Sequence, residues 1–258
     1  MFDSGLGGLS VLRAIRQTMP LADLIYVADS AHAPYGERSD TFITERSHEI
    51  SRFLVSQDVQ GIVVACNTAT AVAVHELRQR LTHIPIIGVE PGIKPAIALS
   101  KSKRVGVLAT PGTLTSQKFK TLVTRHGSDA ALFLQPCPGL AKAIESGNLD
   151  RPELTALIDE FCEPLKKADV DTVVLGCTHY PFVSPQLQRS LGQHITLLDT
   201  ADAVAKHTAA QMGQRALSAQ GSLPPTSGTT TLWSTGDPTL LSQVAHGWLG
   251  WRVNAHQI

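Results

Sequence analysis

The sequence has no net charge, no secretory start and no apolar run long enough to cross a membrane. Its 22 Lys and Arg residues balance 22 Asp and Glu residues, which excludes the overall basic field that gathers nucleic acid or anionic membrane surfaces. Residues 1–8 contain neither a positive start nor an apolar stretch, so we expect no secretory signal. The longest strongly apolar stretch, residues 61–74, is interrupted by polar residues and is shorter than the ~20 residues that span a bilayer. We therefore predict a cytoplasmic protein with no membrane or nucleic-acid partner.

The sequence also lacks a C-x-x-C pair and any regular Cys/His spacing. Its four cysteines are Cys66, Cys137, Cys162 and Cys177. In a reducing compartment we expect them to be free thiols, and the spacing argues against a structural zinc site. Because free cysteine is among the most buried residue types, the default role of each one is inert packing.

Short apolar runs alternate with amphipathic segments along the chain. The runs are four to six residues long and mostly aliphatic, which is typical of strands buried on both faces of a parallel sheet. We predict strands at 24–28, 61–65, 84–89, 104–108, 131–134, 172–175 and 195–198, with helices at 9–19, 41–56, 69–81, 116–126 and 152–168. This alternation indicates an α/β fold with doubly wound parallel sheets, in which ligands bind beyond the carboxyl ends of the strands.

The length of 258 residues and the 43% hydrophobic content allow one large domain or two ordinary ones. A strand that ends in turn residues at 88–92 indicates a change of domain near residue 90. We predict a discontinuous first α/β domain of residues 1–90 plus 200–258 and a second of residues 91–199. A Pro/Ser/Gly-rich loop is expected at 221–228 within the returning tail.

Two loops between predicted elements have unusual composition. Residues 3–8 (DSGLGG) lead directly into a helix and leave backbone N–H groups at a positive helix end. The segment lacks the motifs of a phosphate loop or a dinucleotide site, so a tight glycine turn is the simpler interpretation. Residues 29–38 (DSAHAPYGER) gather many donors and acceptors after a strand, and turn formation at Pro34 and Gly36 does not explain them.

The most informative pattern is a cysteine just beyond an apolar strand, and it occurs twice. Residues 61–68 (GIVVACNT) contain Cys66 and residues 171–179 (DTVVLGCTH) contain Cys177. At a helix start the local field lowers a thiol pKa from about 8.5, which favours the thiolate. Such a thiol can be a nucleophile, a redox centre or a base for proton transfer. Two thiols from two similar halves suggest a reaction that needs a base on each side of one carbon.

These and other segments resemble the glutamate racemases of the aspartate/glutamate racemase superfamily. The matching segments run in the family's order along nearly the whole chain: FDSGLGGLSV at 2–11, DS at 29–30 with PYG at 34–36, ACNTA at 65–69, GVEP at 88–91, ATPGT at 109–113 and LGCTHYP at 175–181. The resemblance implies two similar doubly wound domains with the active site in the cleft between them.

The resemblance also implies racemisation of L-glutamate to D-glutamate with no cofactor and no metal. It assigns the two bases to Cys66, which would deprotonate D-glutamate, and Cys177, which would deprotonate L-glutamate. Asp3 and His179 would assist them, and Glu145 is either a further helper or a solvated helix carboxylate. The implied substrate-binding residues are Asp3, Ser4, Tyr35, Gly36, Asn67, Thr68, Thr178 and His179. Cys137 and Cys162 match no catalytic position.

The implied biological role is the supply of D-glutamate for peptidoglycan synthesis. Dimers of several arrangements occur among the glutamate racemases, so the resemblance also suggests a homodimer. Relatives usually begin with a few more apolar residues before FDSG, so we expect either a short first strand or a natural start upstream of Met1. Three other interpretations stay open at this point. They are an aspartate or hydantoin racemase, a thiol redox protein, and a non-catalytic role such as topoisomerase inhibition.

Overall fold

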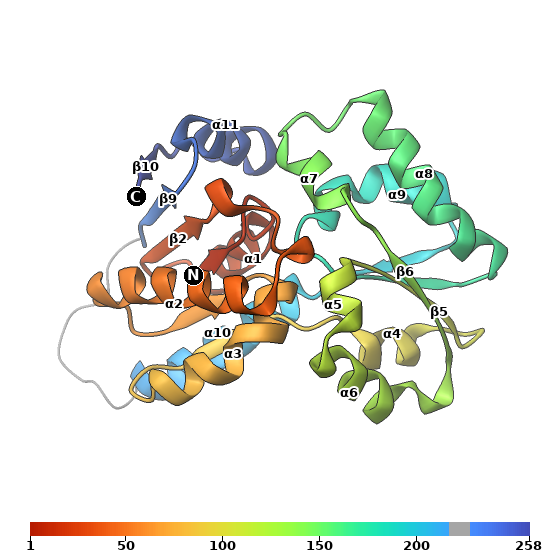
Figure 1. Ribbon diagram of the computed structural model, residues 1–258, viewed down its shortest axis with the longest axis horizontal. Coiled ribbons are helices and arrows are strands. Elements are labelled where there is room, and N and C mark those ends of the chain that lie inside the picture. Colours follow the sequence, from red (N-terminus) through yellow and green to blue (C-terminus); the bar gives the residue numbers. More distant parts are fainter. Residues whose placement is uncertain (217–227) are drawn as a thin grey trace.

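The computed structural model of the protein describes residues 1–216 and 228–258. Most of the loop predicted at 221–228 therefore lies outside the described residues. Figure 1 shows two lobes side by side, each built around its own parallel sheet. Both chain termini lie in the lobe with the larger sheet.

The strands and helices alternate as predicted. The strands are β1 (Phe2–Asp3), β2 (Leu24–Ala28), β3 (Ile62–Val64), β4 (Ile86–Gly88), β5 (Arg104–Ala109), β6 (Ala131–Pro136), β7 (Thr172–Leu175), β8 (Thr196–Leu198), β9 (Thr230–Ser234) and β10 (Ala255–Gln257). The α-helices are α1 (Leu9–Thr18), α2 (Asp40–Ser56), α3 (Asn67–Arg80), α4 (Ile93–Leu99), α5 (Pro111–Thr115), α6 (Gln117–His126), α7 (Leu140–Glu145), α8 (Pro152–Lys167), α9 (Ser184–Leu191), α10 (Ala201–Ala216) and α11 (Pro238–Leu249). Short 3-10 turns are η1 (Ser30–His32), η2 (Tyr35–Glu37), η3 (Gly127–Asp129) and η4 (Tyr180–Val183).

The two sheets share one arrangement of strands. The first lobe has the order β10-β9-β2-β1-β3-β4 and the second has β6-β5-β7-β8, with all strand pairs parallel. The four strands β2-β1-β3-β4 are thus repeated as β6-β5-β7-β8. In each lobe the first of these four strands along the chain, β1 or β5, lies between the second and the third. The predicted α/β class with two parallel sheets is confirmed.

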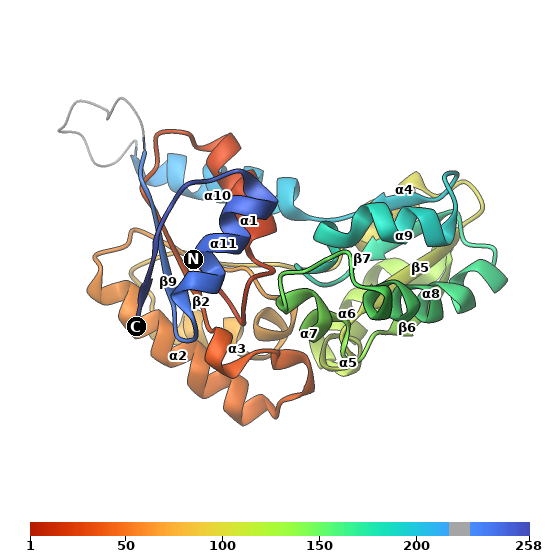
Figure 2. The ribbon, with the colours of Figure 1, turned by 90° about the horizontal axis from the view of Figure 1, so that it is seen from above.

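Helices cover both faces of each sheet (Figures 1 and 2). In the first lobe, apolar residues of α1, α10 and α11 form one core, and those of α2 and α3 form another. In the second lobe, α7, α8 and α9 pack on one face while α4 and α6 pack on the other. Because both faces are covered, the central strands are buried, which explains why they read as continuous aliphatic runs.

The predicted strands and helices agree with the structure to within a few residues, but the strands β9 and β10 and the helices α4, α5, α7, α9 and α11 were not among them. β9 is TTLWS and β10 is AHQ, and β10 is an edge strand whose His256 and Gln257 are exposed. Strands that are covered on fewer sides carry polar residues, so the apolar signal that revealed the inner strands is weak there. Within the described ranges, no helix combines the length and the apolar character needed to cross a membrane.

Candidate active site

A cavity lies where the carboxyl ends of strands from both sheets meet. The space it encloses, including open solvent at its mouth, is about 270 Å³. The residues that line it are Ser4, Pro34, Tyr35, Gly36, Cys66, Asn67, Thr68, Thr110, Ala141, Cys177, Thr178 and His179. Residues from both lobes therefore form one pocket with two cysteines in its wall.

Cys66 lies between the end of β3 and the start of α3. Its backbone is extended, and its Sγ accepts a hydrogen bond from Ala69 N at 3.4 Å, so the thiol caps the helix. The Sγ also lies 3.9 Å from Ser4 Oγ. We predicted that the helix start lowers the thiol pKa; the hydrogen bond from Ala69 N acts in that direction, but larger effects outweigh it. Burial, followed by the negative charge of Asp3, raises the pKa of Cys66 well above its ordinary value.

Cys177 follows β7, the strand of the second sheet that corresponds to β3. Its Sγ lies 3.5 Å from His179 Nδ1. The neighbouring Gly176 approaches β5 closely, because a Cβ atom there would come within 2.9 Å of the Ala109 Cβ. The glycine thus lets the chain leave the sheet directly at the cysteine.

His179 lies between Cys177 and Glu145. Its Nε2 contacts Glu145 Oε1, which also accepts a hydrogen bond from Leu6 N at 2.5 Å. Burial lowers the pKa of His179, but the negative charges of Cys177 and Glu145 more than offset this and raise it well above its ordinary value. The Glu145 side chain is only 14% exposed, so it is not a solvated helix carboxylate.

The glycines of the DSGLGG segment make room for this pair of side chains. A Cβ atom on Gly5 would lie 2.1 Å from Glu145 Oε1, and one on Gly7 would lie 2.3 Å from His179 Nδ1. The segment is therefore a close-approach turn at which groups of the second lobe reach the first. This agrees with the interpretation as a turn rather than a nucleotide loop.

Asp3 is completely buried at the end of β1. Its carboxylate accepts hydrogen bonds from Ser4 N at 2.7 Å, from Gly8 N at 2.5 Å, and across the lobes from Thr178 Oγ1 at 3.1 Å. Burial raises its pKa, and His179 opposes this effect. Neither Asp3 nor Glu145 lines the cavity, but each contacts residues that do: Asp3 contacts Ser4 and Thr178, and Glu145 contacts His179.

Three threonine hydroxyls bridge the two lobes at another part of the cavity wall. Thr68 Oγ1 lies 3.1 Å from Thr110 Oγ1 and 3.3 Å from Thr113 Oγ1, and the latter two are 3.0 Å apart. Thr110 and Thr113 belong to the matching segment ATPGT at 109–113, but neither was predicted to have a role. These two hydroxyls lie three residues apart directly after the strand predicted at 104–108, and this pattern could have identified them as site residues.

Asn67 supplies an unused donor at the same wall. Its side chain is buried, and within the part of the chain that the structure describes its Nδ2 has no hydrogen-bond partner. A buried polar atom without a partner is costly unless a ligand or water satisfies it. The cavity is therefore suited to a ligand with acceptor oxygens.

The remaining cysteines are core residues. Cys137 and Cys162 are 1% and 0% exposed and belong to the apolar core of the second lobe. Burial raises the pKa of both thiols, that of Cys162 to about 11. Among the described residues, no group of three or more His, Cys, Asp or Glu side chains is placed to hold a metal ion.

Comparison with known proteins connects this geometry to a family. The model of the family described as Asp/Glu/Hydantoin racemase matches residues 9–208. A glutamate racemase from Stutzerimonas stutzeri is 47% identical over 244 residues, which cover 95% of this chain and 90% of that protein. A glutamate racemase isoform from Bacillus anthracis has a similar structure, with a TM-score of 0.88, 29% identity, and coverage of 100% of this chain and 95% of that one.

The glutamate racemase from Escherichia coli, solved with L-glutamate and the activator UDP-MurNAc-Ala, has a TM-score of 0.86 and 29% identity, with coverage of 100% of this chain and 96% of that one. The resemblance inferred from the motifs is thus confirmed. The chain belongs to the Asp/Glu/Hydantoin racemase family and is an amino-acid racemase, an isomerase.

Proposed function

We propose that this protein interconverts L- and D-glutamate by a two-base mechanism that uses Cys66 and Cys177 and needs no cofactor or metal. The observation that carries the proposal is that the two thiols follow corresponding strands, β3 and β7, and line one cavity. A ligand in that cavity has a sulfur available from each lobe. The substrate assignment rests on the glutamate racemases that the chain resembles.

The reaction moves one proton off the α-carbon and another onto it. For L-glutamate, the Cys177 thiolate takes the α-proton and becomes a thiol, while Cys66 gives its S–H proton to the opposite face of the carbanion and becomes a thiolate. The reverse direction starts with the Cys66 thiolate and D-glutamate. No bond to a cofactor forms, and each turnover leaves the two sulfurs with exchanged protonation states.

The thiols need electrostatic help. A positioned acid or base typically contributes ~10²–10⁴-fold, so stabilisation of the carbanion by fixed dipoles must supply much of the remainder. His179, whose pKa is raised, is placed to stabilise negative charge on Cys177, with Glu145 orienting it. On the other side, Asp3 is hydrogen-bonded to Ser4, which neighbours Cys66.

The substrate's polar groups would bind to neutral donors in the cavity wall. Asn67 Nδ2 offers a free donor, and Ser4, Thr68 and Thr178 contribute hydroxyls. Tyr35 and Gly36 complete the wall. Neutral donors can bind the substrate's carboxylates without a cation between the two sulfurs. A cation there would favour the thiolate form of the nearer cysteine.

Racemisation in deuterated water tests the mechanism. Two separate bases place a solvent deuteron on the α-carbon of newly formed product, while recovered substrate should exchange little at early times. Proton NMR of both enantiomers after chiral separation gives the measurement. Equal early labelling of substrate and product would contradict two bases and favour one shared base. Parallel assays with aspartate and hydantoin test the substrate, and faster turnover of either would contradict glutamate.

We also propose that the D-glutamate supplies peptidoglycan synthesis in the cytoplasm. A bacterial strain whose own glutamate racemase has been removed should grow without added D-glutamate when it carries this chain. The variant Cys66→Ala is the matched control and should not restore growth. The division into a discontinuous first domain and a second domain of residues 91–199 stays a prediction, as does the homodimer, which light scattering tests.

A further inference from the structure

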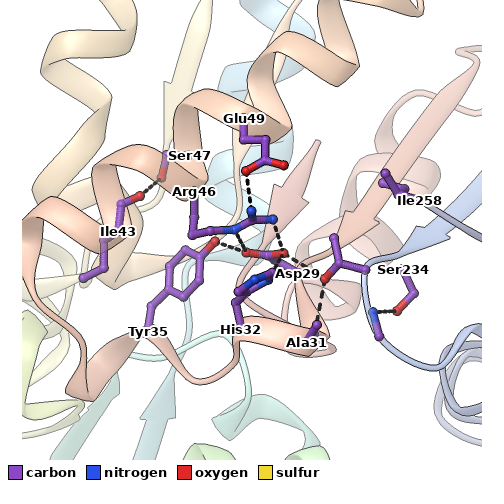
Figure 3. Close-up of polar contacts among 12 residues, drawn as sticks. Asp29, Ala31, His32, Tyr35, Ile43, Arg46, Ser47, Glu49, Ser234 and Ile258 are labelled. Atoms are coloured by element: carbon purple, nitrogen blue, oxygen red, sulfur yellow. Dashed lines mark hydrogen bonds and ion pairs between the residues drawn. The ribbon is translucent and has the colours of Figure 1, made fainter.

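The polar loop after β2 is organised around one buried carboxylate, that of Asp29 (Figure 3). Asp29 is 0% exposed. Arg46 donates to it twice, from Nε at 2.9 Å and from Nη2 at 2.8 Å. Tyr35 Oη donates at 2.5 Å and Thr235 Oγ1 at 2.8 Å, and His32 Nδ1 lies at 2.9 Å. These five contacts with one side chain explain why residues 29–38 contain so many polar groups, which turn formation at Pro34 and Gly36 did not explain.

Asp29 and its partners come from separate parts of the first lobe. Asp29 follows β2, Arg46 lies on α2, Tyr35 belongs to η2 and Thr235 follows β9. Tyr35 is the only one of the contacting residues that also lines the cavity. Its ring is 1% exposed and packs in the core beneath α2 and α3. The hydroxyl therefore anchors the η2 turn to Asp29 and points into the network rather than toward a ligand (Figure 3).

The same turn is held from its other side by the second lobe. A Cβ atom on Gly36 would lie 2.7 Å from the Thr110 Cβ, and one on Gly112 would lie 3.0 Å from Gly36 O. The backbone of η2 is thus pressed against α5 while its tyrosine is bonded to Asp29. Rotation of Tyr35 away from Asp29 would free this part of the cavity wall.

Arg46 makes the anchor strong. Its planar guanidinium engages both oxygens of Asp29, and it also contacts Glu49 at the surface. Although burial raises the pKa of Asp29, the hydrogen bonds from Arg46, Tyr35 and Thr235 lower it below its ordinary value. An ionised carboxylate is a stronger acceptor for a tyrosine hydroxyl than a neutral one.

We propose that Arg46 is a positioning residue for substrate binding, which acts through Asp29 and the Tyr35 hydroxyl to hold the Tyr35–Gly36 turn in place before the substrate enters. The inference rests on the proposed racemase function. A preformed wall avoids the ordering cost that a loose turn would pay on binding. The turn contacts the substrate and takes no part in the proton transfer. The binding free energy that it contributes should therefore be the same in the ground state and in the transition state. Its loss then raises KM and leaves kcat nearly unchanged.

The central test uses Tyr35→Phe, which removes only the hydroxyl, together with Arg46→Met and Arg46→Lys. We expect Tyr35→Phe and Arg46→Met to raise KM for glutamate about tenfold, with kcat within about twofold of wild type. Arg46→Lys should be intermediate, because lysine keeps the charge but cannot form the two-pronged contact. Arg52→Met, which removes an exposed charge on the same helix, is the matched control and should leave both constants unchanged.

The direction of the reaction provides an internal check. The two enantiomers have equal free energy, so kcat/KM must fall by the same factor in both directions in every variant. Hydrogen exchange followed by mass spectrometry gives a readout that does not depend on activity. Amides in residues 33–38 should exchange faster in Tyr35→Phe than in wild type, while peptides of the second lobe away from α5 should not change.

Several results would overturn the proposal. One is an unchanged KM in Tyr35→Phe, even if its melting temperature falls, because the network would then be structural only. Another is a fall in kcat at constant KM. Unchanged exchange in residues 33–38 would show that the hydroxyl does not hold the turn. If wild type fails to racemise glutamate, the proposed function fails, whereas the exchange measurement still decides whether the anchor exists. If Arg46→Met does not fold, the KM and the hydrogen exchange of Tyr35→Phe test the proposal.

Discussion

The two halves of the molecule present the same thiol in different electrostatic surroundings. Cys66 and Cys177 follow corresponding strands, but only Cys66 begins a helix, and its charged neighbour is the Asp3 carboxylate. Cys177 is followed instead by a short 3-10 turn, and its neighbour is His179. The repeated topology therefore explains where the sulfurs lie, and the unequal neighbours govern which of them can hold negative charge. Because burial and the Asp3 carboxylate raise the pKa of Cys66, we expect Cys66 to be a thiol in the free enzyme.

Replacing either thiol by alanine should have the largest effect. We expect Cys66→Ala and Cys177→Ala each to lower kcat/KM by at least ~10³-fold in both directions, because in the proposed mechanism each thiol serves one face of the α-carbon. Polarimetry with each enantiomer measures the loss. Substantial racemisation by either variant would show that the reaction does not need a thiol from each lobe.

Replacing Asp29 should affect the stability of the first lobe and its response to acid. The pKa of Asp29 is lower in the folded protein than in the unfolded chain, so the ionised carboxylate stabilises the fold. This contribution is complete above about pH 4, the ordinary Asp value, and is lost as the pH falls toward the folded pKa. Asp29→Asn should lower the free energy of unfolding at pH 7 by about 2–4 kcal/mol, because Arg46 loses its buried charge partner and keeps only the exposed Glu49.

Urea unfolding at a series of pH values measures this effect. The difference between wild type and Asp29→Asn should shrink as the pH falls from 5 toward 3. Glu160→Gln, at an exposed carboxylate on α8, is the control and should change little. A difference that stays constant with pH would contradict an ionised Asp29 that stabilises the fold.

Alkylation should distinguish the sulfurs of Cys66 and Cys177 directly. Both are nearly buried, at 5% and 7% exposed, so access differs little between them. Because burial and Asp3 raise the pKa of Cys66, we expect iodoacetamide at neutral pH to modify Cys177 about tenfold faster. Mass spectrometry of the peptides measures the ratio. Glu145→Gln should reduce the ratio of the two rates, because it removes the carboxylate that stabilises a protonated His179. A faster reaction at Cys66 than at Cys177 would contradict the prediction.

The smallest effect is expected at a cysteine outside the cavity. Cys162 packs in the core of the second lobe and is 0% exposed. Cys162→Ala should lower the free energy of unfolding by about 1 kcal/mol through the cavity it leaves, with kcat and KM unchanged. Thermal unfolding and the racemase assay provide the two measurements. A loss of activity greater than that of stability would mean that more than two cysteines take part.

Much of the fold was readable from local patterns. The aliphatic runs that became β2, β3, β5 and β7 are buried on both faces, so their composition reports their position in the sheet. β9 and β10 escaped prediction because their polar residues hide the apolar signal. The chemistry-bearing segments were found because each directly follows a predicted strand, and parallel strands bring their carboxyl ends to one edge of a sheet.

The electrostatics of the site were not readable in this way. The helix start at Cys66 predicted a lowered pKa, but a rule about local dipoles contains no information on burial or on Asp3, 63 positions earlier in the chain. Likewise, Glu145 could be a solvated carboxylate or a helper until the fold placed it against His179 and Leu6.

The sequence by itself determined the α/β class, the position of each cysteine at the end of a strand and the family of the protein, because these depend on short segments with their own composition. Only the tertiary structure decided which charges face each sulfur and that Arg46 and Thr235 meet on Asp29, where Thr235 is 206 positions from its partner. Interactions of this kind depend on distances through space and on exclusion of water. The chain acquires both only when its two sheets and their helices pack together.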